Sequence, residues 1–240
     1  MSLSYTTFNA TDVLSIEINP HPRAGVWFLN WKIKPKGLTQ RPIPTADVTA
    51  GAGLYGLCFN GQVIYIGSFL GKKGVEGIFA GDVVATRWWT HIGSITARGD
   101  CVHIARRSLG ALIKNFGIAH SMTAGFLSAN NPKLLHTDAG NSAPLRRLLF
   151  ASELQSTLFD LTTNPIDVLG QFTFAYVRYK HMPADMNSKT LSAHIEAAEK
   201  DLIRCHAPIC NSTHVPANAD PTRISCGELE HLLRQALNLN

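Results

Sequence analysis

Two tripeptides that contain tyrosine and glycine stand at the ends of a short apolar hairpin. They are Gly53-Leu54-Tyr55 and Tyr65-Ile66-Gly67, with nine residues between them. Strands that only fill a core favour β-branched residues over glycine, so these glycines indicate close approach by a backbone or a ligand. An ordinary tyrosine has a pKa of about 10, which is too high for a good base at neutral pH. A tyrosine that accepts a proton therefore needs neighbouring groups that stabilise its phenolate.

A candidate source of positive charge follows the hairpin. Arg87 lies in VVATRWWTHIGSITARG, a predicted helix at residues 83–99 that Asp82 can cap and Gly99 can end. The guanidinium group offers a planar fork of donors and keeps its proton at any working pH. His91 follows Arg87 by four residues. Because an i, i+4 pair shares one helix face, both side chains can point at a single phosphate.

These residues must be positioned by a short series of elements. Asn60-Gly61 is a strong hairpin signal. In later segments the apolar residues recur either with period two, as in a strand, or with the period of a helix. With the middle of the chain removed, the order is β-β-α-β-α, which is an α+β fold. The predicted elements of this order are strands at 55–59, 63–66 and 171–180 and helices at 83–99 and 188–206, and a short helix at 227–238 follows them.

This order of elements, with GLY and YIG on its first two strands, resembles the GIY-YIG nuclease family. The family pattern continues with an arginine on the next helix, then a metal-binding glutamate on a later helix, and often an asparagine. Arg87 fits that pattern, and EKDLIRCHAPICN supplies Glu199 and Asn211. The spacings from Arg87 to His91 and from Glu199 to Asn211 resemble the restriction-endonuclease branch in particular. The chain departs from the pattern at Leu54, which replaces isoleucine, and in its slightly short spacer.

The resemblance covers residues 53–99 and 169–211 and implies both a reaction and a cofactor. It implies an α+β GIY-YIG core that hydrolyses phosphodiester bonds, with Mg²⁺ as the metal and Mn²⁺ as a substitute. Tyr55 would activate the water, and Tyr65 would orient the phosphate or the water. The residues that it places in the catalytic set are Tyr55, Tyr65, Arg87, His91, Glu199 and Asn211.

Some of these assignments have competing interpretations. One glutamate suits a single Mg²⁺ whose shell is completed by waters and phosphates, and Glu199 is that ligand in the family pattern. Glu196, one helical turn earlier, competes with it, and the distance to Asn211 favours Glu199. His91 can equally be a surface histidine, and Asn211 can equally cap the turn after the helix.

Basic residues outside the catalytic set are candidate DNA contacts. Restriction-type members of the family commonly cut both strands of a symmetric site, so the resemblance implies double-stranded DNA and a homodimer as partners. The alternative for each basic residue is a solvated surface charge. The candidates are Lys72 and Lys73 on the glycine-rich loop after YIG, and Arg106, Arg107, Arg146 and Arg147 on predicted helices.

Composition indicates a globular protein. The 240 residues are 45% apolar and 16% charged, and the net charge of +5 permits a nucleic-acid partner without requiring one. The predicted organisation is an N-terminal arm at 1–50 that includes a strand at 26–33, and a nuclease core at 51–211. A helical insertion at 100–168 interrupts the core, and a tail with a short helix follows at 212–240.

Other classes of protein are less compatible with the sequence. No apolar run reaches the roughly 20 residues that a membrane span needs, and the start does not resemble a secretory signal. Five scattered cysteines favour a reducing, cytosolic location. The cluster of Cys205, His206, Cys210 and His214 matches no common zinc-finger spacing. Two rival functions stay open, namely a structure-selective or nicking nuclease of phage type and a catalytically inactive DNA-binding module.

Overall fold

The computed structural model describes residues 2–18, 31–44, 48–71, 77–95, 165–211, 213–216, 219 and 222–238. The chain divides into two compact units. The first comprises residues 1–14, 35–88 and 169–240, and the second comprises residues 15–34 and 89–168.

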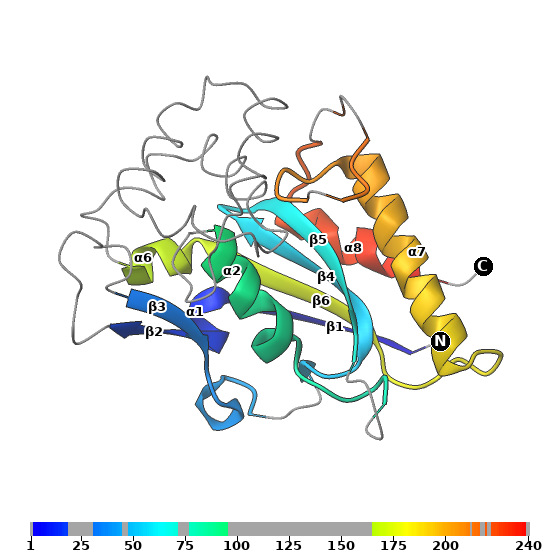
Figure 1. The fold of residues 1–240 in the computed structure, drawn as a ribbon, viewed down its shortest axis with the longest axis horizontal. Coiled ribbons are helices and arrows are strands. Elements are labelled where there is room, and N and C mark those ends of the chain that lie inside the picture. The colour runs from blue at the N-terminus through cyan, green and yellow to red at the C-terminus, as the bar shows by residue number, and fades with distance from the viewer. Residues whose placement is uncertain are drawn as a thin grey trace, which may run out of the picture. The chain divides into compact units, whose positions relative to one another are not determined.

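A four-stranded antiparallel sheet forms the centre of the first unit (Figure 1). In spatial order its strands are β1 (Leu3–Asn9), β6 (Phe172–Tyr179), β4 (Ala52–Phe59) and β5 (Gln62–Leu70). The predicted strand at 171–180 is confirmed as β6. The segment that forms β1 was expected in an arm, yet it pairs with β6 from Leu3 to Asn9 and completes the sheet. Together with the helices of this unit, the sheet confirms the α+β class.

The hairpin of β4 and β5 has the turn that the sequence predicts. Asn60 and Gly61 both have positive φ, at 48° and 77°, as a tight two-residue hairpin turn requires. The register places Tyr55 opposite Gly67 and Leu57 opposite Tyr65, with an irregularity after Leu57. Tyr55 and Tyr65 therefore project from neighbouring strands on one face of the sheet.

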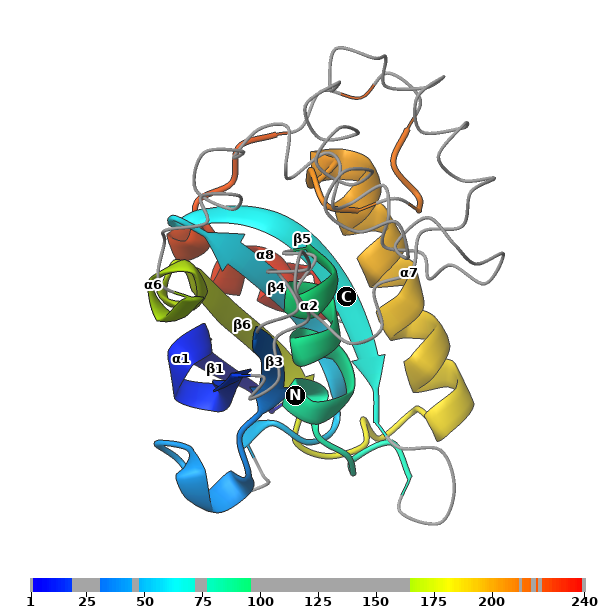
Figure 2. The ribbon, with the colours of Figure 1, turned by 60° about the vertical axis from the view of Figure 1, so that its left-hand side comes forward.

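Two helices cover the other face of the sheet (Figures 1 and 2). α7 (Ser188–His206) has the predicted bounds, because Asn187 caps it by accepting hydrogen bonds from the backbone N–H groups of Lys189 and Thr190. α7 runs beside β5, and α8 (Cys226–Leu237) packs against β4 and β6. The core on this face is mainly aliphatic. Residues expected in a C-terminal tail thus belong to the first unit.

Aromatic side chains fill the face of the sheet that carries the tyrosines. Trp88, at the end of the π-helical turn η4 (Val84–Trp88), is fully buried. Its ring stacks on Phe174 with centroids 4.4 Å apart and lies edge-on to Tyr55 and Tyr176. This packing fixes the end of η4 against the sheet, one residue after Arg87.

The remaining elements of the first unit are short. α1 (Ala10–Val13) follows β1, and the short 3₁₀ helix η2 (Leu38–Gln40) precedes β4. The segment before η2 is bound to α1 through Lys36. The backbone N–H of Lys36 donates to the carbonyl of Val13, and the Nζ of Lys36 donates to the carbonyl of Thr11. Residues 1–14 and 35–44 are thereby tied together.

The second unit contains a two-stranded sheet of β2 (Leu14–Ile18) and β3 (Trp31–Pro35), each of which extends by one residue into the first unit. α2 (Trp89–Ile95) and most of α6 (Pro165–Gly170) also belong to it. The predicted strand at 26–33 overlaps β3 at its end, and its start lies outside the described residues. The predicted helices of the insertion also lie outside them. In the part of the chain that is described, no helix is long and apolar enough to cross a membrane.

Candidate functional site

The two tyrosines of the paired tripeptides form a buried couple. Their ring centroids are 6.0 Å apart, and a side-chain hydrogen bond joins them. Tyr55 is 1% exposed and Tyr65 is 8% exposed. Both belong to the first unit, on the aromatic face of the sheet.

The glycines of the tripeptides make this arrangement sterically possible. A Cβ atom at Gly67 would lie 2.7 Å from the Cζ and hydroxyl oxygen of Tyr55 and 2.8 Å from Cε1 of Tyr65. A Cβ atom at Gly53 would overlap the carbonyl oxygen of Val177 on β6. The expectation of close approach is therefore confirmed, and the approaching groups are the protein's own tyrosine rings and backbone.

The environment of Tyr55 holds its hydroxyl in the protonated form. Burial raises the pKa of Tyr55 well above its ordinary value, and the nearby Tyr65 and Glu199 raise it further. Arg87 acts in the opposite direction and lowers the pKa. Arg87 and Glu199 thus both lie within electrostatic reach of one phenol. A proton-accepting role for Tyr55 requires more positive charge than this set of residues supplies.

Glu199 reaches the β4–β5 hairpin from α7. Its Oε2 accepts a hydrogen bond of 2.5 Å from Oγ of Ser68, the residue that follows YIG. Glu199 is half-buried, whereas Glu196 is exposed. Of the two glutamates, Glu199 is therefore the one held against the hairpin. Ser68 was not among the predicted site residues, since a serine after a glycine carries no distinctive signal.

Asn211 is buried against the edge strand β5. It is 4% exposed, its Oδ1 accepts from the backbone N–H of Ile66 at 3.0 Å, and its Nδ2 donates to the Ile66 carbonyl at 2.8 Å. The backbone N–H of Cys210 donates to the Ile64 carbonyl beside it. The side-chain amide thus pairs with the outer edge of β5 as a neighbouring strand would. Asn211 holds the central residue of YIG in place.

Arg87 and His91 belong to different units. Arg87 is exposed on η4 in the first unit, and His91 is buried on α2 in the second. The idea that the two share a phosphate stays a prediction. The other basic candidates, Lys72, Lys73, Arg106, Arg107, Arg146 and Arg147, lie outside the described residues.

The structure provides one candidate ligand for a divalent cation at the hairpin. No group of three or more histidine, cysteine or acidic side chains is arranged for metal binding within the described ranges, which include Cys205, His206, Cys210 and His214. Glu199 offers a carboxylate that Ser68 orients. An oxygen ligand of this kind suits Mg²⁺, which is often held by one or two carboxylates together with waters and phosphates.

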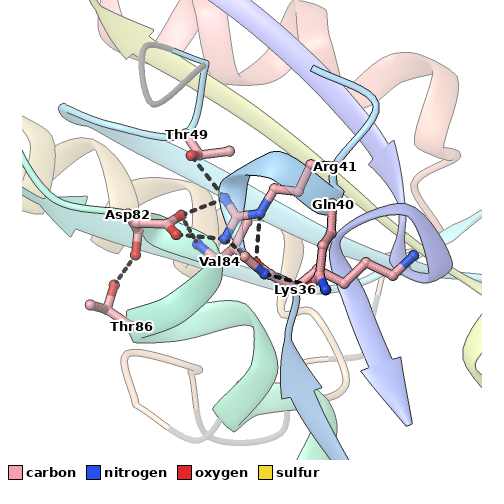
Figure 3. Close-up of polar contacts among 8 residues, drawn as sticks. Lys36, Gln40, Arg41, Thr49, Asp82, Val84 and Thr86 are labelled. Carbon is pink, nitrogen blue, oxygen red and sulfur yellow. Dashed lines mark hydrogen bonds and ion pairs between the residues drawn. The ribbon is translucent and has the colours of Figure 1, made fainter. Parts of the chain in front are cut away.

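A polar network that the sequence does not predict lies at the start of η4 (Figure 3). Asp82 was expected to cap the helix, and its Oδ1 does accept from the backbone N–H of Val84 at 3.1 Å. The same carboxylate forms a two-pronged ion pair with Arg41, at 3.1 and 2.6 Å. Arg41 lies in the proline-rich stretch QRPIP, where no local pattern distinguishes it from a surface arginine.

Comparison with known proteins gives no match to the chain, whether with family models, curated proteins or solved structures.

Proposed function

We propose that this chain is a Mg²⁺-dependent, sequence-specific endonuclease of the GIY-YIG type that hydrolyses phosphodiester bonds in double-stranded DNA. The observation that carries the proposal is that Arg87 and Glu199 lie within electrostatic reach of the buried Tyr55, which is joined to Tyr65 in the first unit. The Tyr55 and Tyr65 hydroxyls are joined by a hydrogen bond, and the charges of Arg87 and Glu199 both act on Tyr55. Phosphodiester hydrolysis needs an activated water, a cation near the developing charge and hydrogen-bond donors for the phosphate.

Each side chain has a role that its chemistry permits. The Arg87 guanidinium would bind two oxygens of the scissile phosphate, and its exposure leaves it accessible to DNA. The Tyr55 phenolate would accept a proton from the attacking water. Tyr65 would hold the phosphate or the water in line through its hydroxyl, and Asn211 would keep Tyr65 in register by fixing Ile66.

Glu199 would hold the Mg²⁺, with Ser68 fixing one carboxylate oxygen. A bound divalent cation supplies positive charge to the reacting phosphate and favours the deprotonated form of neighbouring groups. The raised pKa of Tyr55 makes such charge necessary, because burial, Tyr65 and Glu199 all raise this pKa and Arg87 lowers it. Tyr55 is also 1% exposed, so the proposal requires that DNA binding opens a path to its hydroxyl.

Digestion of unmethylated bacteriophage and plasmid DNA tests the proposal. The purified chain is incubated with DNA and Mg²⁺, or with EDTA, beside Glu199→Ala and the matched control Glu196→Ala. Discrete fragments from wild type and Glu196→Ala, and intact DNA with EDTA or Glu199→Ala, are the expected result. Nicking or smearing would keep the chemistry and favour the structure-selective alternative. Intact DNA in every reaction, with DNA binding retained, would contradict an enzymatic function.

A homodimer that cuts both strands of a symmetric site belongs to the same proposal. Sedimentation of the protein, with and without an oligonucleotide duplex that contains the cleavage site, tests the homodimer separately. Two chains per duplex are expected, and one chain per duplex would leave the hydrolysis in place but remove the symmetric mode of cutting.

A further inference from the structure

Arg41 is a buried arginine that uses its whole guanidinium group. Its side chain is 2% exposed, and it forms the two-pronged ion pair with Asp82. Nε and Nη2 donate to the carbonyl of Lys36 at 3.0 and 2.9 Å, and Nη1 donates to Oγ1 of Thr49 at 3.3 Å. Figure 3 shows the guanidinium enclosed by these partners. Because a guanidinium has five N–H donors, this set of contacts satisfies the group.

The partner of Arg41 fixes the first turn of η4. Besides capping Val84 through its carboxylate, Asp82 accepts hydrogen bonds at its carbonyl from the backbone N–H and Oγ1 of Thr86, at 3.0 and 2.7 Å. The N–H of Val83 donates to the carbonyl of Thr49 at 2.9 Å. Arg41 and Thr49 thus connect the chain before β4 to the beginning of η4.

The turn that carries Arg87 is held at both ends. Asp82 anchors its start, and Trp88 anchors its end in the aromatic core. Arg87 stands between these anchors and is exposed. A π-helical turn is a rare conformation that is often found at functional sites, and its backbone needs support from its surroundings. The Arg41–Asp82 pair supplies that support from a distant part of the sequence.

We infer that the Arg41–Asp82 ion pair is a positioning element that aims Arg87 at the scissile phosphate. This inference rests on the proposed function, and it assigns to Lys36, Arg41 and Thr49 a part in catalysis without contact with DNA. Arg41 acts through Asp82 on the direction of η4, and so on Arg87. Loss of the pair lets the guanidinium of Arg87 move, and a displacement of about 1 Å can lower a rate by about a hundredfold.

A double-mutant cycle on the full chain tests the inference. Single-turnover cleavage rates and DNA affinities are measured for wild type, Arg41→Gln, Arg87→Ala and the double variant, at a temperature where all are folded. We expect Arg41→Gln to lower the rate by about 10- to 100-fold in wild type, with a smaller change in DNA affinity. In the Arg87→Ala background the same change should alter the rate by less than about twofold, because its target is gone.

Equal fold-losses in the two backgrounds would overturn the inference, since Arg41 would then act on the fold in general. Unchanged cleavage in Arg41→Gln would overturn it as well. Asp82→Asn is the second variant, because an amide still offers Oδ1 to the N–H of Val84 but carries no charge for Arg41. It should reproduce the Arg41→Gln result. Arg204→Gln is the matched control, since its ion pair with Asp201 is exposed on α7.

Amide hydrogen exchange provides a measurement that does not depend on cleavage. Peptides covering residues 83–88 should exchange faster in Arg41→Gln than in wild type, while peptides from α7 should not change. Unchanged exchange at 83–88 would overturn the inference even if the chain cleaves DNA. If wild type cleaves no DNA, the proposed function fails, and the exchange result alone decides whether the ion pair holds η4.

Discussion

The two faces of the four-stranded sheet differ in chemistry. The face under α7 and α8 is packed mainly with aliphatic side chains such as Leu54, Val177 and Leu229. The opposite face is packed with rings, and Tyr55 and Tyr176 bring buried hydroxyl groups into it. Aliphatic groups stabilise a fold but cannot move a proton or bind a phosphate. Buried polar groups cost free energy unless they are paired. The α7–α8 face carries fewer of them, namely the Tyr179 hydroxyl, which donates to the carbonyl of Leu237, and Ser68 with Glu199 at the edge of the sheet.

A comparison of Tyr55 with Tyr176, both on the aromatic face, should give the largest difference in cleavage rate. Tyr55→Phe removes the proposed proton acceptor and should lower the single-turnover cleavage rate by about 10²- to 10⁴-fold. Tyr176→Phe removes a hydroxyl that donates to the carbonyl of Gly51, and should cost about 1–3 kcal/mol of stability. Cleavage by folded Tyr176→Phe should stay near that of wild type. Equal loss of cleavage in both variants would mean that the face acts only as a core.

Leu229 tests the aliphatic face. Its methyl groups lie over Gly56 on β4, and the side chain is fully buried. Leu229→Ala should lower the free energy of unfolding by about 2–5 kcal/mol, because it removes transfer free energy and leaves a cavity. Urea unfolding measures this change. Below the unfolding transition the cleavage rate should match wild type, and a large loss there would break the contrast between the faces.

Replacement of Asn211 should affect both stability and cleavage, and the loss of cleavage rate should be smaller than for Tyr55→Phe. Asn211→Ala leaves the N–H and carbonyl of Ile66 without their partners and should cost about 1–3 kcal/mol in urea unfolding. Because Ile66 adjoins Tyr65, cleavage by the folded variant should also fall, by about tenfold. A loss of 10³-fold or more with unchanged stability would instead favour direct contact between Asn211 and the reacting groups.

The smallest expected effect is a change in the free energy of unfolding at alkaline pH, caused by Tyr179. Burial raises the pKa of Tyr179 to about 12. The folded state then binds this proton more tightly than the unfolded state, whose tyrosine pKa is about 10. The contribution of protonated Tyr179 to the free energy of unfolding is complete below about pH 10 and is lost as the pH rises through about 12. Tyr179→Phe should make the pH dependence of unfolding shallower between these values, and an unchanged slope would contradict the assignment.

Local patterns made part of the structure predictable. The hairpin turn at Asn60-Gly61 follows from the tolerance of both residues for positive φ, and the bounds of α7 follow from its cap and its apolar period. The close approach at Gly53 and Gly67 was also expected from residue type alone. In each case the determining interactions lie within one segment or between adjacent strands.

Contacts between distant segments were not predictable. The pairing of β1 with β6 joins residues more than 160 positions apart, and no local signal marks it. Arg41 and Asp82 are likewise distant in sequence, so neither residue identifies the other. Asn211 fits a family motif as a catalytic residue, yet its partner is the backbone of Ile66. Backbone partners leave no trace in residue type, so the pairing of Asn211 with Ile66 could not be predicted from the sequence.

The most direct test of the account is the dependence of cleavage rate on Mg²⁺ concentration in wild type, Glu199→Gln and Glu196→Gln. Glutamine keeps the size of the side chain and removes its charge, so the comparison isolates the carboxylate held by Ser68. We expect the same saturation curve for wild type and Glu196→Gln, and no cleavage by Glu199→Gln at any Mg²⁺ concentration. Cleavage by Glu199→Gln with a wild-type Mg²⁺ dependence would contradict it.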